Sequence, residues 1–169
     1  MPTIATVGVY EFDAAGFIRA LDAAGITRII DIRQRRGVRG PQYAWANARR
    51  LQALLSAAHI GYEHRPELAP TTELRHLQYR DDDHQGVGKR SRVRLSPDYI
   101  RGYTEEILDH APLEPLVDRL PVHGIAALLC VEATALACHR SLLANRLADC
   151  FGFDVVHLEP TEPTDLDLI

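Results

Sequence analysis

The sequence predicts a single α/β domain with a three-layer, Rossmann-like fold, in which a mostly parallel sheet is flanked by helices. Short apolar runs rich in β-branched residues alternate with segments whose apolar residues recur at helical spacing. One late run, 124–132, is continuously apolar, which is typical of a strand buried on both faces of a parallel sheet. The 169 residues suit one hydrophobic core, and strands separated by helices favour parallel pairing.

The first part of the chain alternates strand and helix. A β-branched run reaches Gly8 and Tyr10, and the helical pattern after it stops at Gly25. The next strand is apolar until Asp31. The expected elements are strands at 3–10, 26–33 and 60–65 and helices at 12–25 and 47–59.

The middle of the chain breaks this alternation. Residues 66–95 are mostly polar, and we expect an irregular excursion with at most one short helix, around 73–79. Ser96 as N-cap and Pro97 in the first turn then begin a helix. The remaining expected elements are helices at 98–109, 113–120 and 138–152 and strands at 124–132 and 153–158. The domain therefore spans 1–158, and the tail 159–169, with two prolines and four acidic residues, is expected to be loose.

Charge and hydropathy exclude some classes of function. The net charge of −4 provides no overall basic field, so it does not support nucleic-acid binding. No apolar run approaches the roughly 20 residues of a membrane span, and the start does not resemble a signal peptide, so we expect a cytoplasmic protein without membrane contact. Three cysteines make a poor disulfide framework, which favours reduced thiols.

Ligands of parallel α/β sheets bind beyond the carboxyl ends of the strands. The sequence places chemically capable side chains at these ends, and we expect them to meet at one edge. They are Tyr10, Asp31, Arg33, Glu63, His64, Cys130 and Glu132, followed by Cys138, His139 and Arg140 at the start of a helix.

The segment from Cys130 to Arg140 carries the strongest indication of chemistry. A cysteine at a helix N-terminus is near unpaired amides that favour a thiolate, and Arg140 adds positive charge. We therefore take Cys138, Cys130, Glu132 and His139 as candidate catalytic residues. The alternative is structural, because free cysteines are among the most buried residue types.

This segment, LLCVEATALACHRSLLANRL, resembles the cysteine–x–glutamate and cysteine–histidine–arginine signature of the domain of unknown function 488 family. The opening strand, helix and DIR strand end, and the closing VVHL, resemble the same family. The resemblance implies that Asp31, Arg33, Cys130, Glu132, Cys138, His139 and Arg140 carry the family pattern. It does not imply a reaction. Two departures, Leu68-Ala69-Pro70-Thr71 after the third strand and Val9-Tyr10-Glu11 after the first, suggest a subfamily with a different ligand.

The second candidate feature is an arginine-rich loop directly after the second strand, in which Arg33, Arg35, Arg36 and Arg39 surround Gly37 and Gly40. Guanidinium groups at strand ends suit a phosphate or carboxylate, although an arginine-rich loop is also commonly just solvated. Tyr43 and Trp45 nearby could stack on a base or cap the core. The candidate ligand-binding residues are Tyr10, Asp31, Arg33, Arg36, Arg39 and Arg140.

Three weaker patterns are interpreted as structural. The glycine-rich stretch 86–90 lacks the spacing of a phosphate-binding loop. The acidic run 81–84 is interpreted as a solvated face rather than a cation site. Cys150 is expected in the core.

The leading hypothesis is an enzyme or ligand-binding domain that holds an anionic small molecule, preferably a nucleotide or nucleic-acid fragment, at the carboxyl edge of the sheet. One alternative is a thiol-redox or metal-binding module. The spacing of Cys130, Cys138 and His139 is unusual for a zinc site, and adjacent cysteine and histidine side chains are expected to diverge. No metal ligand is therefore assigned. Another is a non-catalytic partner-binding domain in which Cys, Glu, His and Arg form a brace. Reaction, cofactor and oligomeric state stay open.

Overall fold

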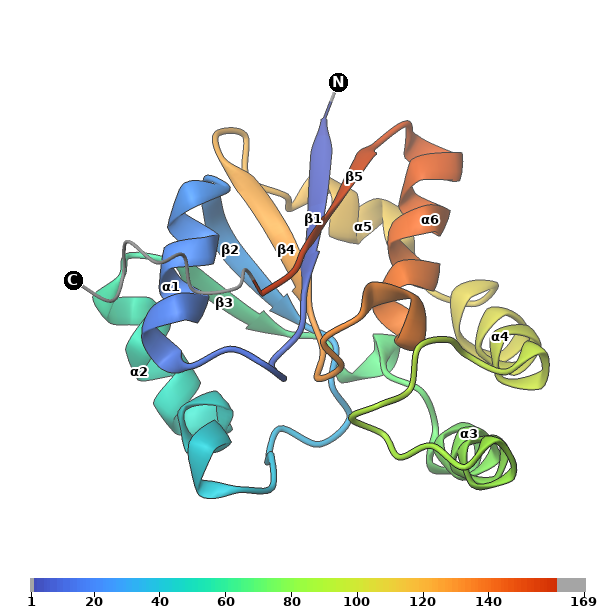
Figure 1. Cartoon of the computed structure of the whole chain (residues 1–169). Helices are drawn as coiled ribbons and strands as arrows, with labels where there is room; N and C mark the ends of the chain where they lie inside the picture. Colours follow the sequence, from blue (N-terminus) through green and yellow to red (C-terminus); the bar gives the residue numbers. More distant parts are fainter. Residues whose placement is uncertain (1, 161–169) are drawn as a thin grey trace.

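A computed structural model describes residues 2–160 and contains one five-stranded parallel sheet (Figure 1). The strand order across the sheet is β3-β2-β4-β1-β5, and each neighbouring pair is parallel. The strands are β1 (Thr3–Val7), β2 (Ile26–Asp31), β3 (Gly61–His64), β4 (Ile125–Leu129) and β5 (Asp154–Leu158).

Helices cover both faces of this sheet (Figure 1). On one face lie α1 (Ala14–Ala23) and α2 (Ala48–Ala57), preceded by the 3-10 helix η1 (Pro41–Ala46). On the other face lie α4 (Pro97–Tyr103), the π-helical turn η3 (Thr104–Leu108), α5 (Leu113–Asp118) and α6 (His139–Phe151). Helix α3 (Thr72–Gln85) packs against α4, and the 3-10 turns η2 (Pro66–Leu68) and η4 (Ala135–Ala137) precede α3 and α6.

The order of the strands explains which helix lies on which face. The chain steps toward one edge of the sheet from β1 to β2 to β3, and toward the other edge from β3 to β4 and from β4 to β5. Crossovers between parallel strands are almost always right-handed, so steps in opposite directions place their helices on opposite faces. The loops after the neighbouring strands β1 and β4 therefore diverge, and ligands bind at such a switch point.

Two apolar cores lie on the two faces of the sheet. Fully buried Phe17 and Leu51 belong to the core beneath α1 and α2. Fully buried Tyr103 and Leu143 belong to the core beneath α4 and α6. The sheet is thus buried on both faces, as the continuous apolar run in β4 predicts.

Short local signals set the ends of the helices. Asp13 and Thr71 each accept a hydrogen bond from the amide three residues on, at the starts of α1 and α3. Gly86 and Gly152 adopt the left-handed conformation at the ends of α3 and α6, where residues with a side chain are disfavoured.

The predicted single α/β domain with a mostly parallel, three-layer sheet is confirmed, and all five expected strands form. Residues 66–95 are less irregular than expected, because the helix predicted around 73–79 extends over Thr72–Gln85. Most of the predicted tail 159–169 lies outside the described residues. No helix of the described part is both long and apolar enough to cross a membrane.

Candidate functional site

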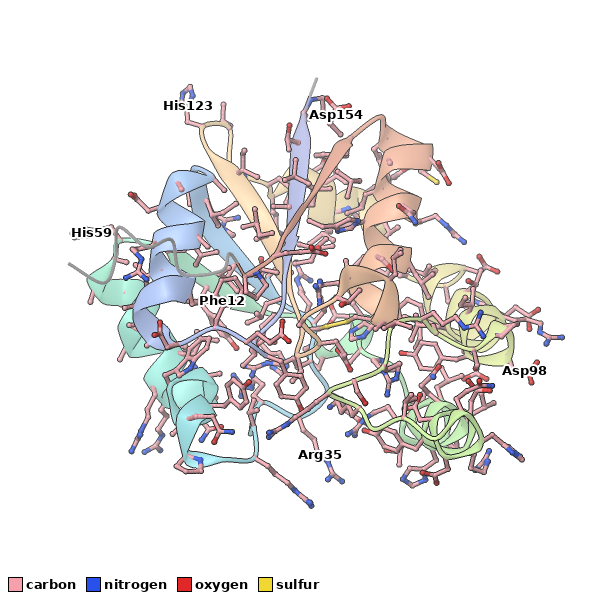
Figure 2. All side chains as sticks on the ribbon, in the orientation of Figure 1. Phe12, Arg35, His59, Asp98, His123 and Asp154 are labelled. Atoms are coloured by element: carbon pink, nitrogen blue, oxygen red, sulfur yellow. A yellow bond between two sulfur atoms is a disulfide. The ribbon has the colours of Figure 1, made fainter. Side chains whose placement is uncertain are left out.

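The carboxyl ends of β2, β4 and β1 are held together by backbone hydrogen bonds that continue beyond the strands. Ile32 donates to the Leu129 carbonyl (3.0 Å), and Tyr10 donates to the Val131 carbonyl (2.9 Å). The segments that follow these three strands consequently begin side by side. Figure 2 shows Arg35 at this edge, whereas His123 and Asp154 lie at the opposite edge, where strands begin.

A cavity of about 670 Å³ opens at this edge. Its walls come from the loops after β1, β2 and β4, from helix α3 and from the segment 88–95. Among the residues of the predicted site, seven line it: Tyr10, Arg33, Arg39, Cys130, Glu132, Cys138 and His139. The other three, Asp31, Arg36 and Arg140, do not line it.

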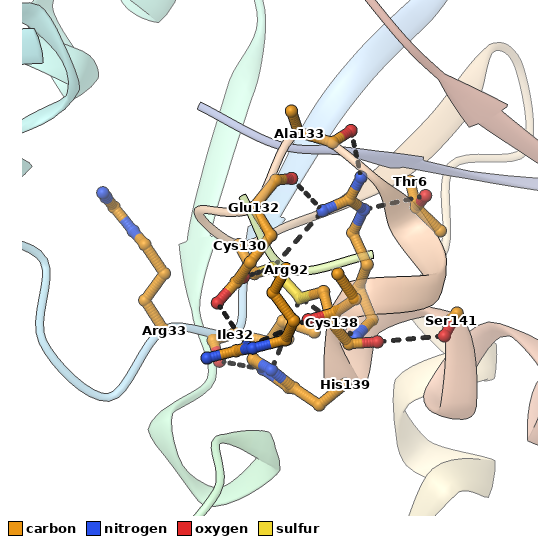
Figure 3. The surroundings of a disulfide bond; sticks show 12 residues. Thr6, Ile32, Arg33, Arg92, Cys130, Glu132, Ala133, Cys138, His139 and Ser141 are labelled. Atoms are coloured by element: carbon orange, nitrogen blue, oxygen red, sulfur yellow. Dashed lines mark hydrogen bonds and ion pairs between the residues drawn. A yellow bond between two sulfur atoms is a disulfide. The ribbon is translucent and has the colours of Figure 1, made fainter. Parts of the chain in front are cut away.

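Cys130 and Cys138 are joined by a disulfide, with Cα atoms 7.3 Å apart (Figure 3). Reduced thiols were the expectation for this chain, and the structure differs because the turn after β4 returns to α6 beside the end of its own strand. Cys138 is the N-cap of α6, as expected, and its sulfur accepts from the Arg140 amide (3.5 Å). Both cysteines are 1 % exposed, whereas Cys150, expected in the core, is exposed.

His139 is buried beside the two sulfurs, and its ring orientation is fixed. Its Nε2 lies 2.9 Å from the carbonyl of Ile32, and a carbonyl can only accept, so Nε2 carries the proton. Nδ1 therefore presents its lone pair toward Cys138 Sγ, 3.6 Å away. Burial lowers the pKa of His139, and the bond to Ile32 only partly opposes this, so the ring is neutral at neutral pH.

Glu132 supplies the only carboxylate in the cavity wall among the described residues. One carboxylate oxygen lies 3.0 Å from Cys130 Sγ, and the other lies 3.5 Å from Arg92 Nη1. Burial raises the pKa of the neighbouring Tyr99 well above its ordinary value, as does the charge of Glu132, so the phenol stays protonated as a donor. A carboxylate, a phenol and an imidazole thus share one wall with the sulfurs.

Arg92 is a site residue that the sequence did not reveal. It is buried and forms a bidentate ion pair with Asp82. It also donates to the Ala137 carbonyl (3.1 Å), next to Cys138. Asp82 belongs to the acidic run interpreted as a solvated face, yet it is 4 % exposed. No local pattern marks either residue, because the pairing depends on how α3 folds against the segment 88–95.

Arg140 is fully buried and braces the turn that carries the cysteines. Nε donates to the Thr6 hydroxyl (3.1 Å), Nη2 to the Ala133 carbonyl (3.1 Å), and Nη1 to the backbone carbonyl of Glu132 (Figure 3). Burial lowers its pKa to about 10, and Glu132 opposes this, so the guanidinium stays charged at neutral pH. Arg140 was predicted to bind ligand, but its position fits a structural role.

Arg33 also uses its guanidinium internally. Nε and Nη2 donate to the carboxylate of Asp31 (2.9 and 2.8 Å), and Nη1 donates to the Ala46 carbonyl. Tyr62 donates to the same carboxylate (2.6 Å), and Arg36 contacts the Tyr62 hydroxyl. This buried pair anchors the arginine-rich loop and contributes little free positive charge to the cavity.

The free positive charge comes from other residues of the cavity wall, and five cations line it: Arg35, Arg39, Arg75, Lys89 and Arg90. None of them forms an ion pair with another described residue. Arg90 lies over the rings of Tyr10 and Tyr43 (5.1 and 5.3 Å to the centroids) and donates to the Arg39 carbonyl. The 66–95 excursion therefore forms one wall of the site, which its sequence did not indicate.

A comparison with family models identifies the family of the chain. The model described as "Domain of unknown function DUF488" matches residues 13–147, a range that contains β2, β4 and the turn from Cys130 to Arg140. No curated protein and no solved structure matches the chain. Because the match covers well over half of the sequence, the chain belongs to the domain of unknown function 488 family.

Proposed function

We propose that the protein binds a phosphate-bearing small molecule, with a nucleotide as the preferred class, in the cavity at the carboxyl edge of the sheet. The observation that carries this proposal is the charge of the cavity wall. Five cations without ion-pair partners among the described residues face one carboxylate, which Arg92 already contacts. Arginine binds phosphate oxygens through parallel N–H donors, and such charge-assisted bonds are stronger than neutral ones.

Several features support a ligand larger than a simple ion. A cavity of about 670 Å³ lies within the range typical of small-molecule sites, about 300–1,000 Å³. Tyr79 lines it and offers an aromatic ring to a base, whereas the ring of Tyr10 is buried against Arg90 and Tyr43. The net charge of −4 argues against extended nucleic acid, because such partners require a broad basic surface.

The same cavity wall also holds groups that could act on the bound ligand. A side chain can transfer a proton to or from a ligand only within hydrogen-bond distance of it. Glu132 and the neutral His139 both line the cavity in which the ligand is proposed to bind. We infer that the cationic side binds the phosphates and that Glu132, His139 and the sulfurs face the remainder of the ligand.

Calorimetric titration at low ionic strength tests the proposal. The probes are inorganic pyrophosphate, AMP and ATP, with adenosine as the uncharged comparison. We expect the phosphate-bearing probes to bind and adenosine not to bind, and affinity to fall as salt rises. Arg39→Ala and Arg75→Ala should each weaken pyrophosphate binding by about tenfold, the loss of one charge-assisted hydrogen bond.

Arg50→Ala is the matched control, because it removes the same charge from an exposed position on α2 outside the cavity wall. Its affinity for pyrophosphate should equal that of the original protein. If no anion binds, or if Arg50→Ala weakens binding as much as Arg39→Ala does, the proposed site is wrong.

The disulfide at the cavity wall favours a second candidate function, thiol–disulfide exchange. A dithiol substrate would be oxidised to its disulfide while Cys130 and Cys138 are reduced to two thiols, so electrons and protons balance. Mixing the oxidised protein with excess dithiothreitol and mapping free thiols over time tests it. Reduction no faster than that of an ordinary buried disulfide would exclude this function.

A further inference from the structure

We propose that the reduced protein binds Zn²⁺ through Cys130 Sγ, Cys138 Sγ and His139 Nδ1, with a fourth coordination position facing the cavity. These ligand atoms all lie within 4.8 Å of one another, and all three residues are buried. The site shares the cavity with the proposed anion site but does not depend on anion binding. Figure 3 shows the three side chains converging at the end of β4.

The histidine is already oriented as a metal ligand. Histidine ligands normally donate their second ring N–H to a carbonyl or carboxylate, which fixes the tautomer and the ring. His139 Nε2 makes this bond to the Ile32 carbonyl, 2.9 Å away, which leaves Nδ1 free to coordinate. Nδ1 and Cys138 Sγ are 3.6 Å apart, so the adjacent side chains converge, contrary to the divergence expected from their sequence positions.

Each sulfur has one neighbouring group that favours a thiolate, the form that binds metal, and at Cys130 this group opposes the effect of the Glu132 carboxylate 3.0 Å away. The Arg140 amide at the start of α6 lies 3.5 Å from Cys138 Sγ, and Arg140 Nη1 lies 3.5 Å from Cys130 Sγ. A helix N-terminus and a guanidinium both stabilise a neighbouring thiolate. Arg140 thus contacts both sulfurs while it holds the turn in place.

The spacing of the backbone accommodates an ion between the sulfurs. The Cα atoms of Cys130 and Cys138 are 7.3 Å apart, beyond the roughly 4.4–6.8 Å usual for a direct disulfide. Thiolates are soft ligands and imidazole also suits zinc, so this set of ligands selects zinc over magnesium or calcium. Three protein ligands with one open position is the arrangement of catalytic rather than structural zinc sites.

Glu132 is placed to act beside such an ion. One of its carboxylate oxygens is 3.0 Å from Cys130 Sγ, and Arg92 holds the other. All three proposed ligands and Glu132 belong to the same cavity wall. A water on the fourth position would therefore face the space where the anion is proposed to bind. The Glu132 carboxylate in the same wall would be the group that accepts its proton.

Metal binding requires the disulfide to open. A phosphine reductant such as TCEP cleaves the S–S bond to two thiols and is itself oxidised to the phosphine oxide with oxygen from water. Zn²⁺ then displaces one proton from each thiol, so two protons are released and no further electrons move. The disulfide and the metal are mutually exclusive, because both use the same two sulfurs.

The experiment measures Zn²⁺ affinity of the full chain by competition with a chromophoric chelator, in buffer without phosphate or nucleotide. TCEP-reduced protein should bind one Zn²⁺ per chain, and the oxidised protein should bind at least 100-fold more weakly. In parallel, Co²⁺ added to the reduced protein should give thiolate-to-cobalt charge-transfer absorption and tetrahedral d–d bands.

Cys138→Ser and His139→Gln should each weaken Zn²⁺ binding by more than about 100-fold. Loss of a residue that only orients a metal ligand already lowers metal affinity by about 10–100-fold, and these variants remove a ligand itself. Cys150→Ser, which removes the exposed free cysteine, should leave affinity unchanged. Circular dichroism verifies that each variant is folded, and the cobalt spectrum tests the original protein directly. Equal Zn²⁺ binding by oxidised and reduced protein, or a cobalt spectrum without thiolate bands, would overturn the proposal. Pyrophosphate binding without zinc binding would contradict this site alone.

Discussion

Arg92 and Asp82 form a buried, bidentate ion pair. Arg92 Nη2 lies 2.8 Å from Asp82 Oδ2, and Arg92 Nε lies 3.0 Å from both carboxylate oxygens. Asp82 comes from α3, and Arg92 comes from the segment that returns toward α4. Gln78 also donates to Asp82 (2.8 Å) and accepts from the Ser96 amide (2.9 Å). The pair thus joins α3 to the segment 88–95, and Arg92 links both to the turn that carries the cysteines through the Ala137 carbonyl (3.1 Å).

Asp82→Asn is expected to lower the free energy of unfolding by about 3 kcal/mol, because it leaves Arg92 buried without its main counter-charge. Urea denaturation followed by circular dichroism measures the change. The exposed Asp83→Asn removes the same charge one residue away and should change stability by less than about 0.5 kcal/mol. Equal effects at the two positions would mean that the Asp82–Arg92 pair does not anchor the excursion.

Gly8→Ala is expected to destabilise the protein through the turn after β4. A Cβ at Gly8 would lie 1.9 Å from the backbone carbonyl oxygen of Glu132 and 3.1 Å from Arg140 Nη1. Backbone cannot rotate away as a side chain does, so we expect a loss of about 2 kcal/mol. The midpoint of urea unfolding measures this loss. Gly37→Ala, where a Cβ meets nothing within 4 Å, should leave the midpoint close to that of the original protein.

The sequence predicts the sheet and the edge of the site well, because both follow from periodicity. Apolar runs define each strand, and parallel strands bring Arg33 and Cys130 to one edge. In the structure β2 and β4 are neighbours, which places the arginine-rich loop beside the Cys130–Arg140 turn.

The sequence does not predict which polar residues are buried. Asp82 and Arg92 lie in a stretch with little apolar periodicity, and only the folding of the segment 88–95 against α3 brings them together. Arg33 ends its expected strand and Arg140 begins its expected helix, yet their guanidinium groups turn inward to Asp31 and to the Thr6 hydroxyl. The free cations of the cavity instead include Arg75 and Lys89, from the excursion 66–95, in which no ligand-binding residue was expected.

Acidification is expected to destabilise the fold in part through His157. Thr6 Oγ accepts from Arg140 Nε, and His157 Nδ1 lies 2.7 Å from the same hydroxyl. Burial lowers the pKa of His157, as does the charge of Arg140, and Glu159 partly opposes this. The unfolded chain therefore takes up a proton first, near a pH of about 6.5, and the free energy of unfolding falls as pH decreases below that value.

His157→Gln should flatten this dependence between about pH 7 and pH 5, and urea denaturation at several pH values measures the slope. His139, whose pKa burial also lowers, leaves a residual slope in the variant. His123→Gln, an exposed position, should retain the full slope. A His157→Gln slope as steep as that of the original protein would contradict this assignment.

Alkylation distinguishes the three cysteines by their burial. Iodoacetamide added to the folded, unreduced protein should modify Cys150 alone, because Cys130 and Cys138 are joined to each other and 1 % exposed. After reduction, Cys138 should still react more slowly than Cys150 at neutral pH in the native state, since burial limits access even though the helix N-terminus favours the thiolate. All three should react in denaturant. Peptide mapping by mass spectrometry identifies the modified positions. Rapid modification of Cys138 in the folded, unreduced protein would show that the sulfurs of Cys130 and Cys138 are neither bonded to each other nor buried.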